Sequence, residues 1–212
     1  MDDLVEWRKA LRKEMIERRK AVPLEEQRAA NERIGNLLLE GFPSLAGATI
    51  GFYWPFNAEV DPRVALHRLR ERGAVTALPV VVAKASPLEF REWYPGVETD
   101  PGVFNLPVPR SPKVVPDVVL MPPVGVDTRG YRLGYGGGYF DRTLASLSPQ
   151  PLKIGLAREV SRIETIHPQP WDIPMDFVIT ERGIHVAEGM RLLDSPAHAN
   201  TLARERWAAR TS

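Results

Sequence analysis

The sequence predicts an α/β fold in a single domain, with a mostly parallel central sheet between two layers of helices. Apolar runs of strand length alternate with segments of helix length along most of the chain. The chain has 212 residues, of which 43% are hydrophobic, so it can bury a sizeable core. We expect the domain to span residues 1–194. Residues 195–212 have little to bury, and we expect a tail that is either mobile or helical.

Four segments have helical patterns. Apolar residues recur at three- and four-residue steps in the first, and Pro23 and Gly41 bracket the second. Asp61 and Pro62 suit the N-cap and the first position of the third. The four helices are expected at residues 3–22, 23–41, 60–73 and 139–147.

The strand-like segments are short apolar runs bounded by turn residues. They are expected at residues 48–54, 74–82, 88–93, 117–122, 152–157, 176–180 and 183–187. Between two of them, residues 94–116 hold many of the chain's 20 prolines, so this stretch is expected to wrap over the surface. Ligands bind at the carboxyl ends of the strands in folds of this class.

The composition excludes several classes of protein. The 28 basic and 27 acidic residues give a net charge of +1, so no polyanionic partner such as a nucleic acid is expected. The absence of cysteine excludes disulfides, thiol catalysis and cysteine-ligated zinc. The charged N-terminus is unlike a signal peptide, and no apolar run is long enough to span a membrane. We therefore expect a cytoplasmic protein without a membrane partner.

Glycine fills four of the five positions from Gly134 to Gly138, between a predicted strand and a predicted helix. Because glycine tolerates positive φ, successive backbone N–H groups in such a loop can converge on an anion. A helix beginning at Tyr139 would add the positive end of its dipole. The alternative is that the glycines only form a tight connection. The loop lacks the Gly-Lys-Ser/Thr of a Walker A motif and does not match GxGxxG.

Charged residues flank this loop. Arg132 and Arg142 carry planar guanidinium groups suited to phosphate oxygens. Asp141 would repel a phosphate unless a cation lay between them, and Mg²⁺ is commonly held by one or two carboxylates together with phosphate. The stretch therefore favours a cradle for a nucleoside triphosphate with its own metal ligand.

The first predicted helix carries two basic stripes. One face holds Arg8, Arg12 and Arg19, at offsets of four and eleven residues. A neighbouring stripe holds Lys9, Lys13 and Lys20. Such a surface is commonly just solvated. If the helix lies across the glycine loop, however, the arginine face becomes a phosphate clamp.

Two further carboxylates and several aromatic residues are candidates for ligand contacts. Glu59 follows a predicted strand, and the alternative for it is a loop carboxylate near a helix start. Asp172, between prolines, is either a second metal ligand or a turn cap. Aromatic rings that either stack on a flat heterocycle or fill the core are Tyr53, Trp54, Phe56, Phe104, Tyr135 and Tyr139.

The segment "RLGYGGGYFDR" resembles the characteristic loop of the 5-formyltetrahydrofolate cyclo-ligase family, also called methenyltetrahydrofolate synthetases. The segments "RKALR", "NAEVD" and "PWDIP" extend the resemblance in the same order, over roughly residues 5–182. The resemblance implies an enzyme in which ATP phosphorylates the formyl oxygen of 5-formyltetrahydrofolate. N10 then attacks this iminophosphate intermediate and phosphate leaves, giving 5,10-methenyltetrahydrofolate and ADP. It also implies that positioning and charge neutralisation suffice, without a protein nucleophile.

The resemblance also implies site residues. Those for ATP are Arg8, Lys9, Arg12, Arg132, Leu133, Gly134, Tyr135, Gly136, Gly137, Gly138, Tyr139 and Phe140. Those for the folate are Arg12, Tyr53, Trp54, Glu59, Phe104, Tyr135, Gly136, Gly137, Gly138 and Tyr139. Asp141 and Asp172 would hold Mg²⁺, and the catalytic residues would be Arg132, Tyr139 and Asp141. We expect a monomer that acts on the small-molecule folate, with or without a polyglutamate tail.

Four positions depart from the family pattern. The family usually has lysine at Arg8, tyrosine at Phe140, glutamate or glutamine at Val108 and glutamine at Ser161. These departures leave two alternatives to the cyclo-ligase. One is a non-catalytic relative that binds folate or nucleotide, and the other is an ATP-dependent enzyme acting on another formyl or carboxyl substrate.

Overall fold

The structure, a computed structural model, describes residues 2–211. The helices are α1 (Asp2–Lys20), α2 (Leu24–Gly41), α3 (Arg63–Glu71), α4 (Tyr139–Ser146) and α5 (Pro196–Thr211). The larger strands are β1 (Thr49–Gly51), β2 (Val75–Val80), β3 (Glu89–Glu92), β7 (Val118–Met121), β10 (Leu152–Leu156), β11 (Phe177–Thr180) and β12 (Gly183–Val186). The smaller strands are β4 (Thr99–Pro101), β5 (Pro107–Pro109), β6 (Lys113–Val114), β8 (Gly125–Val126), β9 (Arg132–Leu133) and β13 (Arg191–Leu192).

A nine-stranded sheet runs through the molecule in the order β13-β12-β11-β10-β7-β1-β2-β3-β6. Its five central strands, from β11 to β2, are parallel to one another. The outer strands on both sides are antiparallel. The prediction of a mostly parallel central sheet is therefore confirmed.

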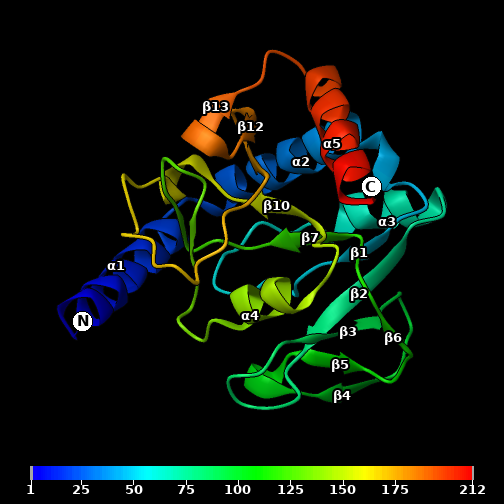
Figure 1. The fold of residues 1–212 in the computed structure, drawn as a ribbon, viewed down its shortest axis with the longest axis horizontal. Coiled ribbons are helices and arrows are strands. Elements are labelled where there is room, and N and C mark those ends of the chain that lie inside the picture. Colours follow the sequence, from blue (N-terminus) through cyan, green and yellow to red (C-terminus); the bar gives the residue numbers. More distant parts are fainter. Residues whose placement is uncertain (1, 212) are drawn as a thin grey trace.

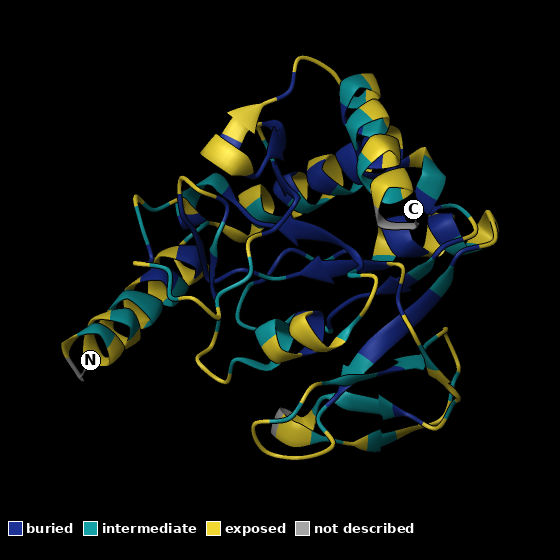
Figure 2. Cartoon of the chain, viewed as in Figure 1, coloured by how far each residue is buried: buried dark blue, intermediate teal, exposed yellow. Residues whose placement is uncertain are grey.

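The two faces of the sheet carry separate hydrophobic layers. Along β7, Val118 and Leu120 join the cluster formed with α2, α3 and α5, whereas Val119 and Met121 join the cluster that contains Leu144 of α4. This is the alternation of side chains expected of a strand buried on both faces. The helices thus form two layers around the sheet, whose central strands are dark and buried (Figures 1 and 2). The three-layer α/β/α prediction is confirmed.

The C-terminal segment has more to bury than we expected. It forms α5, which lies beside α2 (Figure 1) and buries Ala199 and Ala203 completely. The Arg206 guanidinium lies 3.0 Å from Asp176 Oδ1, at the base of β11. The expectation of little burial was wrong, because small alanines on one face let α5 pack closely.

Helix α2 ends at Gly41 as predicted, whereas α3 begins later than predicted. Gly41 is the last residue of α2, and a Cβ there would meet Ile184 Cδ1 at the end of a flexible side chain. The small residue helps α2 lie close to β12 at this position. Helix α3 begins at Arg63, one residue after the predicted start, and Asp61 Oδ1 accepts the Arg63 amide at 3.0 Å.

The glycine loop does not leave a strand of the central sheet directly. From the carboxyl end of β7 the chain first forms a hairpin of β8 and β9, and the loop follows β9. Another excursion, residues 94–116, forms a small lobe in which β4 pairs with β5. No helix among residues 2–211 has the length and apolar character needed to cross a bilayer.

Candidate functional site

The glycine loop and the start of α4 form one surface. Gly136 and Gly138 have φ of 95° and 63°, the left-handed region that favours glycine. Gly138 is the N-cap of α4, and its carbonyl accepts the first intrahelical bond, from the Arg142 amide at 3.1 Å. The amides in the first turn of α4 have no earlier helical acceptor, so this helix end favours negative charge.

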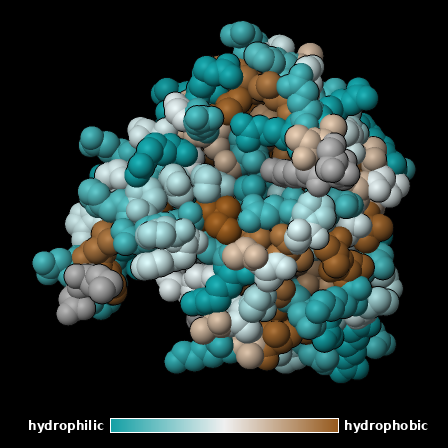
Figure 3. Space-filling view, in the orientation of Figure 1, coloured by the Kyte–Doolittle hydropathy of each residue, from teal (hydrophilic) through white to brown (hydrophobic). Residues whose placement is uncertain are grey.

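Helix α1 lies against this loop. Arg12 Nε donates to the Gly134 carbonyl at 2.8 Å, and a Cβ on Gly136 would lie 3.2 Å from the Arg12 guanidinium carbon. Close approach therefore adds to the need for glycine there. On the space-filling surface a recess lies between α1 and the lobe of β4 and β5 (Figure 3). Of the two alternatives for the arginine face, the structure shows contact with the loop rather than solvation.

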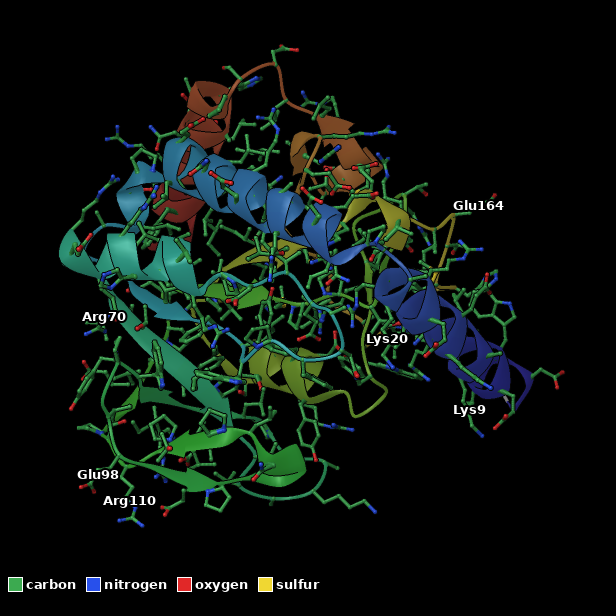
Figure 4. All side chains as sticks on the ribbon, turned by 180° about the vertical axis from the view of Figure 1, so that it is seen from behind. Lys9, Lys20, Arg70, Glu98, Arg110 and Glu164 are labelled. Atoms are coloured by element: carbon green, nitrogen blue, oxygen red, sulfur yellow. The ribbon has the colours of Figure 1, made fainter. Side chains whose placement is uncertain are left out.

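The lysine stripe has the opposite surroundings. Lys9, Lys13 and Lys20 are exposed, and Lys9 Nζ lies 3.3 Å from Glu6. Lys9 stands near the free end of α1 (Figure 4). The structure therefore does not bring Lys9 to the glycine loop, although the resemblance implied an ATP contact.

Arg8 joins α1 to the segment that holds Asp172. Its Nη2 lies 2.6 Å from Asp172 Oδ2, and its Nε donates to the Ile166 carbonyl at 3.0 Å. Asp172 Oδ2 also accepts the Gln169 amide at 2.7 Å, so the aspartate closes a turn as well as pairing with an arginine.

The two predicted metal ligands are neighbours in space. Asp141 Oδ1 accepts the amide of Ile173, the residue after Asp172, at 3.0 Å. Asp141 Oδ2 lies 2.8 Å from Arg132 Nη2, and Arg132 Nη1 donates to the Ile173 carbonyl at 3.0 Å. One residue, Ile173, thus links both carboxylates and Arg132.

Arg132 is buried at the floor of this surface. Its guanidinium lies 5.7 Å from the centre of the Phe140 ring. Burial lowers the pKa of Arg132, and the nearby charges of Asp141 and Asp172 oppose that shift. Its Nη2 pairs with Asp141 and its Nη1 donates to the Ile173 carbonyl, so the guanidinium is held in place beside the loop.

A second group of contacts centres on Glu59. Tyr135 donates its hydroxyl to Glu59 Oε1 at 2.7 Å, and the Phe56 amide donates to Oε2 at 3.0 Å. Burial raises the pKa of Glu59 to about 7, although these two hydrogen bonds and the charge of Arg19 oppose the shift. The Tyr135 and Phe56 rings stack with centroids 4.8 Å apart.

The aromatic residues predicted to contact the ligand lie in different places. Tyr53 is buried in the core, where its hydroxyl donates to the Val60 carbonyl at 2.6 Å. Burial raises the pKa of Tyr53 well above its usual value. Trp54 instead lines a cleft of about 500 Å³ with Trp93, beside the lobe of β4 and β5. The side chain of Phe104 lies outside the described residues.

Known proteins resemble the chain over most of its length. The model of the "5-formyltetrahydrofolate cyclo-ligase family" matches residues 4–181. The chain belongs to this family. Two relatives named 5-formyltetrahydrofolate cyclo-ligase support the assignment. That of Mycolicibacterium smegmatis is 32% identical over 82% of this chain and 94% of its own. That of Escherichia coli K12 is 30% identical over 77% and 94%.

Solved structures of this family share the fold. A 5,10-methenyltetrahydrofolate synthetase from Mycoplasma pneumoniae has a TM-score of 0.69 at 26% identity, covering 82% of this chain and 98% of its own. The Aquifex aeolicus 5,10-methenyltetrahydrofolate synthetase has a TM-score of 0.74 at 26% identity, covering 89% and 96%.

The departures from the cyclo-ligase pattern have different surroundings. Arg8 keeps a charged contact to Asp172, and Phe140 packs against the core beneath Arg132. Val108 lies in β5, one residue after Pro107 of the Trp54 cleft. Ser161 is buried, and its Oγ has no hydrogen-bond partner among the described residues. Leu133 is also buried, and its carbonyl accepts the Val124 amide at 2.8 Å.

The sequence argument missed two buried residues that organise this cyclo-ligase site. Asp127 Oδ1 accepts the amides of Arg129 and Tyr131, both at 2.9 Å, which shapes the hairpin before the glycine loop. Arg158 donates to the Ala58 carbonyl and to Asn31 Oδ1. An aspartate two residues before an amide in a turn is a recognisable signal. No sequence signal indicates the role of Arg158, because its partners are distant in sequence.

Proposed function

We propose that this chain converts 5-formyltetrahydrofolate to 5,10-methenyltetrahydrofolate, with ATP becoming ADP and phosphate. The γ-phosphoryl group passes to the formyl oxygen. N10 then attacks the formyl carbon, the C–O bond to phosphate breaks, and N10 loses its proton. The protein must align ATP with the folate and neutralise phosphate charge, and it needs no nucleophile of its own.

The observation that carries the proposal is the arrangement around residues 134–138. Left-handed glycines and the first turn of α4 lie in one loop, with Arg12 bonded to it and Arg132 just before it. Backbone amides and arginines are the groups that bind phosphate in a preorganised site. We assign ATP to this loop, with Arg8, Arg12 and Arg132 as its arginine contacts and Tyr139 beside them.

Asp141 and Asp172 fit the role of magnesium ligands. Both are carboxylates, and Ile173 brings them to one place beside the loop. No group of three or more His, Cys, Asp and Glu side chains with metal-binding spacing occurs among the described residues. That suits Mg²⁺, which takes one or two carboxylates and completes its shell with phosphate and water. When bound, the ion would neutralise charge on phosphate oxygens.

The folate side of the proposed site lies beside the loop. Trp54 and Trp93 line the cleft, and Phe56 and Tyr135 form a stacked pair. Aromatic faces suit the flat pterin and benzoyl rings of a folate. Residues 54–59 run from the cleft to the Tyr135 contact, so one short segment connects the two halves. We place the pterin in the cleft and the formyl group toward Tyr135.

The test is to mix the purified chain with 5-formyltetrahydrofolate, Mg²⁺ and ATP and to follow the near-ultraviolet absorbance of the methenyl product. We expect growth that requires both ATP and Mg²⁺. Folate binding by calorimetry without growth would instead favour a non-catalytic relative. Release of ADP only with another formyl or carboxyl compound would favour a different ligase.

A further inference from the structure

Arg19 is a buried arginine to which the proposed reaction assigns no role. Its side chain is only 3% exposed and contacts three separate segments. Nε donates to the Asn57 carbonyl at 3.0 Å, and Nη1 to the Pro123 carbonyl at 3.3 Å. Nη2 donates to the Tyr135 hydroxyl at 2.8 Å. One guanidinium therefore ties together the segments after β1, after β7 and in the glycine loop.

The chemistry of the groups fixes the direction of the hydrogen bonds. A guanidinium only donates, so the Tyr135 hydroxyl must accept from Arg19. Its own proton is then directed to Glu59 Oε1, 2.7 Å away. Glu59 Oε2 holds the Phe56 amide at 3.0 Å, and Arg19 Nη2 lies 3.9 Å from Oε1. The phenol is thus held from both sides.

This network fixes the backbone on which Phe56 stands. Asn57 and Ala58 have φ of 49° and 57°, which is strained for residues other than glycine. Such strain persists only where the surroundings hold it. Arg19 accounts for the Asn57 carbonyl, and Arg158 accounts for that of Ala58. Phe56 is therefore held at its own amide and at the turn that follows.

The result is a pair of stacked rings in a fixed position. The Phe56 and Tyr135 ring planes differ by 24°. Tyr135 is 40% exposed although its hydroxyl is bonded on both sides. An exposed ring whose polar end is immobilised presents a face to a flat ligand at little entropic cost.

We propose that Arg19 is a positioning residue: together with Glu59 it holds the Tyr135 hydroxyl, so that Tyr135 and Phe56 form a preformed platform for a flat ring of the substrate. The identity of that ring rests on the proposed function. Arg19 itself does not contact the substrate, and its effect passes through Tyr135.

The first test needs no turnover. Amide hydrogen exchange of residues 133–138 is measured in the ligand-free chain for the wild type, Arg19→Lys and Arg18→Lys. Lysine keeps the charge but has one nitrogen, which cannot reach three acceptors. We expect about tenfold faster exchange in Arg19→Lys. Arg18, paired with Glu14 on the exposed side at 2.5 Å, is the matched control and should leave exchange unchanged. Unchanged exchange in Arg19→Lys would overturn the proposal.

The second test is a double-mutant cycle of Arg19→Lys and Tyr135→Phe. Arg19→Lys should raise the KM for 5-formyltetrahydrofolate about tenfold and should raise the KM for ATP less than that, because Arg19 acts through the Tyr135 ring. In the Tyr135→Phe background, Arg19→Lys should raise the KM for 5-formyltetrahydrofolate less than about threefold, because the hydroxyl through which Arg19 acts is gone. Additive effects, or an effect confined to ATP, would contradict the proposal.

The two tests separate the inference from the proposed function. If the wild type makes no methenyl product while exchange still responds to Arg19→Lys, the function fails and the positioning role stands. If Arg19→Lys does not fold, Tyr135→Phe replaces it in the exchange experiment. Faster exchange at residues 133–138 is then expected, and unchanged exchange overturns the proposal.

Discussion

The two halves of the candidate site are built in opposite ways. On the glycine-loop side, Arg8, Arg132, Asp141 and Asp172 form partly accessible ion pairs beside a helix end. On the Trp54 side, Glu59 is only 5% exposed and accepts hydrogen bonds from the Tyr135 hydroxyl and the Phe56 amide. The first half selects for charge, because its groups can exchange their arginine partners for phosphate and metal. The second half selects for shape, because its carboxylate is already fully occupied.

Removing one charge from the first half should have the largest effect. We expect Asp141→Asn to lower turnover about 10²–10³-fold, a loss typical of one charge-stabilising group. Asparagine keeps an oxygen for the Ile173 amide but loses the charge paired with buried Arg132, so the melting temperature should fall and turnover is compared where both proteins are folded. The assay is methenyl formation at saturating Mg²⁺, with the exposed Asp194→Asn as control. Full activity in Asp141→Asn would remove it as a metal ligand.

Removing the charge from the second half should act on stability in a pH-dependent way. The folded pKa of Glu59 is about 7, against 4.5 as its ordinary value, so the folded state holds the proton more tightly. The stabilisation is complete below pH 4.5 and is lost as pH rises through 7. From pH 4 to pH 8, the wild type should lose up to about 3 kcal/mol relative to Glu59→Gln.

Urea unfolding of the wild type and Glu59→Gln at pH 4, 6 and 8 measures this difference. Other carboxylates titrate equally in both proteins, so they cancel in the comparison. The groups facing Glu59 are Arg19, Tyr135 and Tyr53, and burial raises the pKa of both tyrosines further above this range. A constant difference from pH 4 to pH 8 would mean that folding leaves the pKa of Glu59 unchanged and that its burial carries no penalty.

The charged half was more predictable from sequence than the aromatic half. The glycine loop, the arginine face of α1 and the order of the strands follow from local spacing and from the 2.0 and 3.6 residue periods. Asp141 and Asp172 are local signals too, since each lies in a short motif. Their proximity through Ile173 follows only from the fold.

The aromatic half depends on contacts between distant segments. Tyr53 and Trp54 are adjacent, yet one lies in the core and the other lines the cleft, because β1 ends at Gly51. The turn has positive φ at Ala58 as well as at Asn57, and an alanine gives no sign of such a conformation in the sequence. The packing of α5 against α2 could not be predicted either, because alanines in a sequence do not show which helix they will contact.

Shortening the cleft wall should give a moderate and selective effect. We expect Trp54→Ala to raise the KM for 5-formyltetrahydrofolate about tenfold, because a stacking face is lost. The KM for ATP should stay within about twofold. Trp54→Phe keeps an aromatic ring against Trp93, so its KM for 5-formyltetrahydrofolate should lie between those of the wild type and Trp54→Ala. Equal effects on both substrates would indicate that the cleft and the glycine loop are not separate subsites.

The smallest effect should come from the lysine stripe. Lys9 points away from the loop and pairs with Glu6 in the open, an arrangement worth little in water. Lys9→Gln should therefore change the KM for ATP less than about twofold. Arg12→Gln, the matched change on the inner face, loses the bond to Gly134 and should raise it about tenfold. If both variants raised it equally, α1 would have to rotate when nucleotide binds. The arginine face would then form only on nucleotide binding. The charged half of the site would depend on movement of α1, so the two halves could not be treated as fixed, separate units.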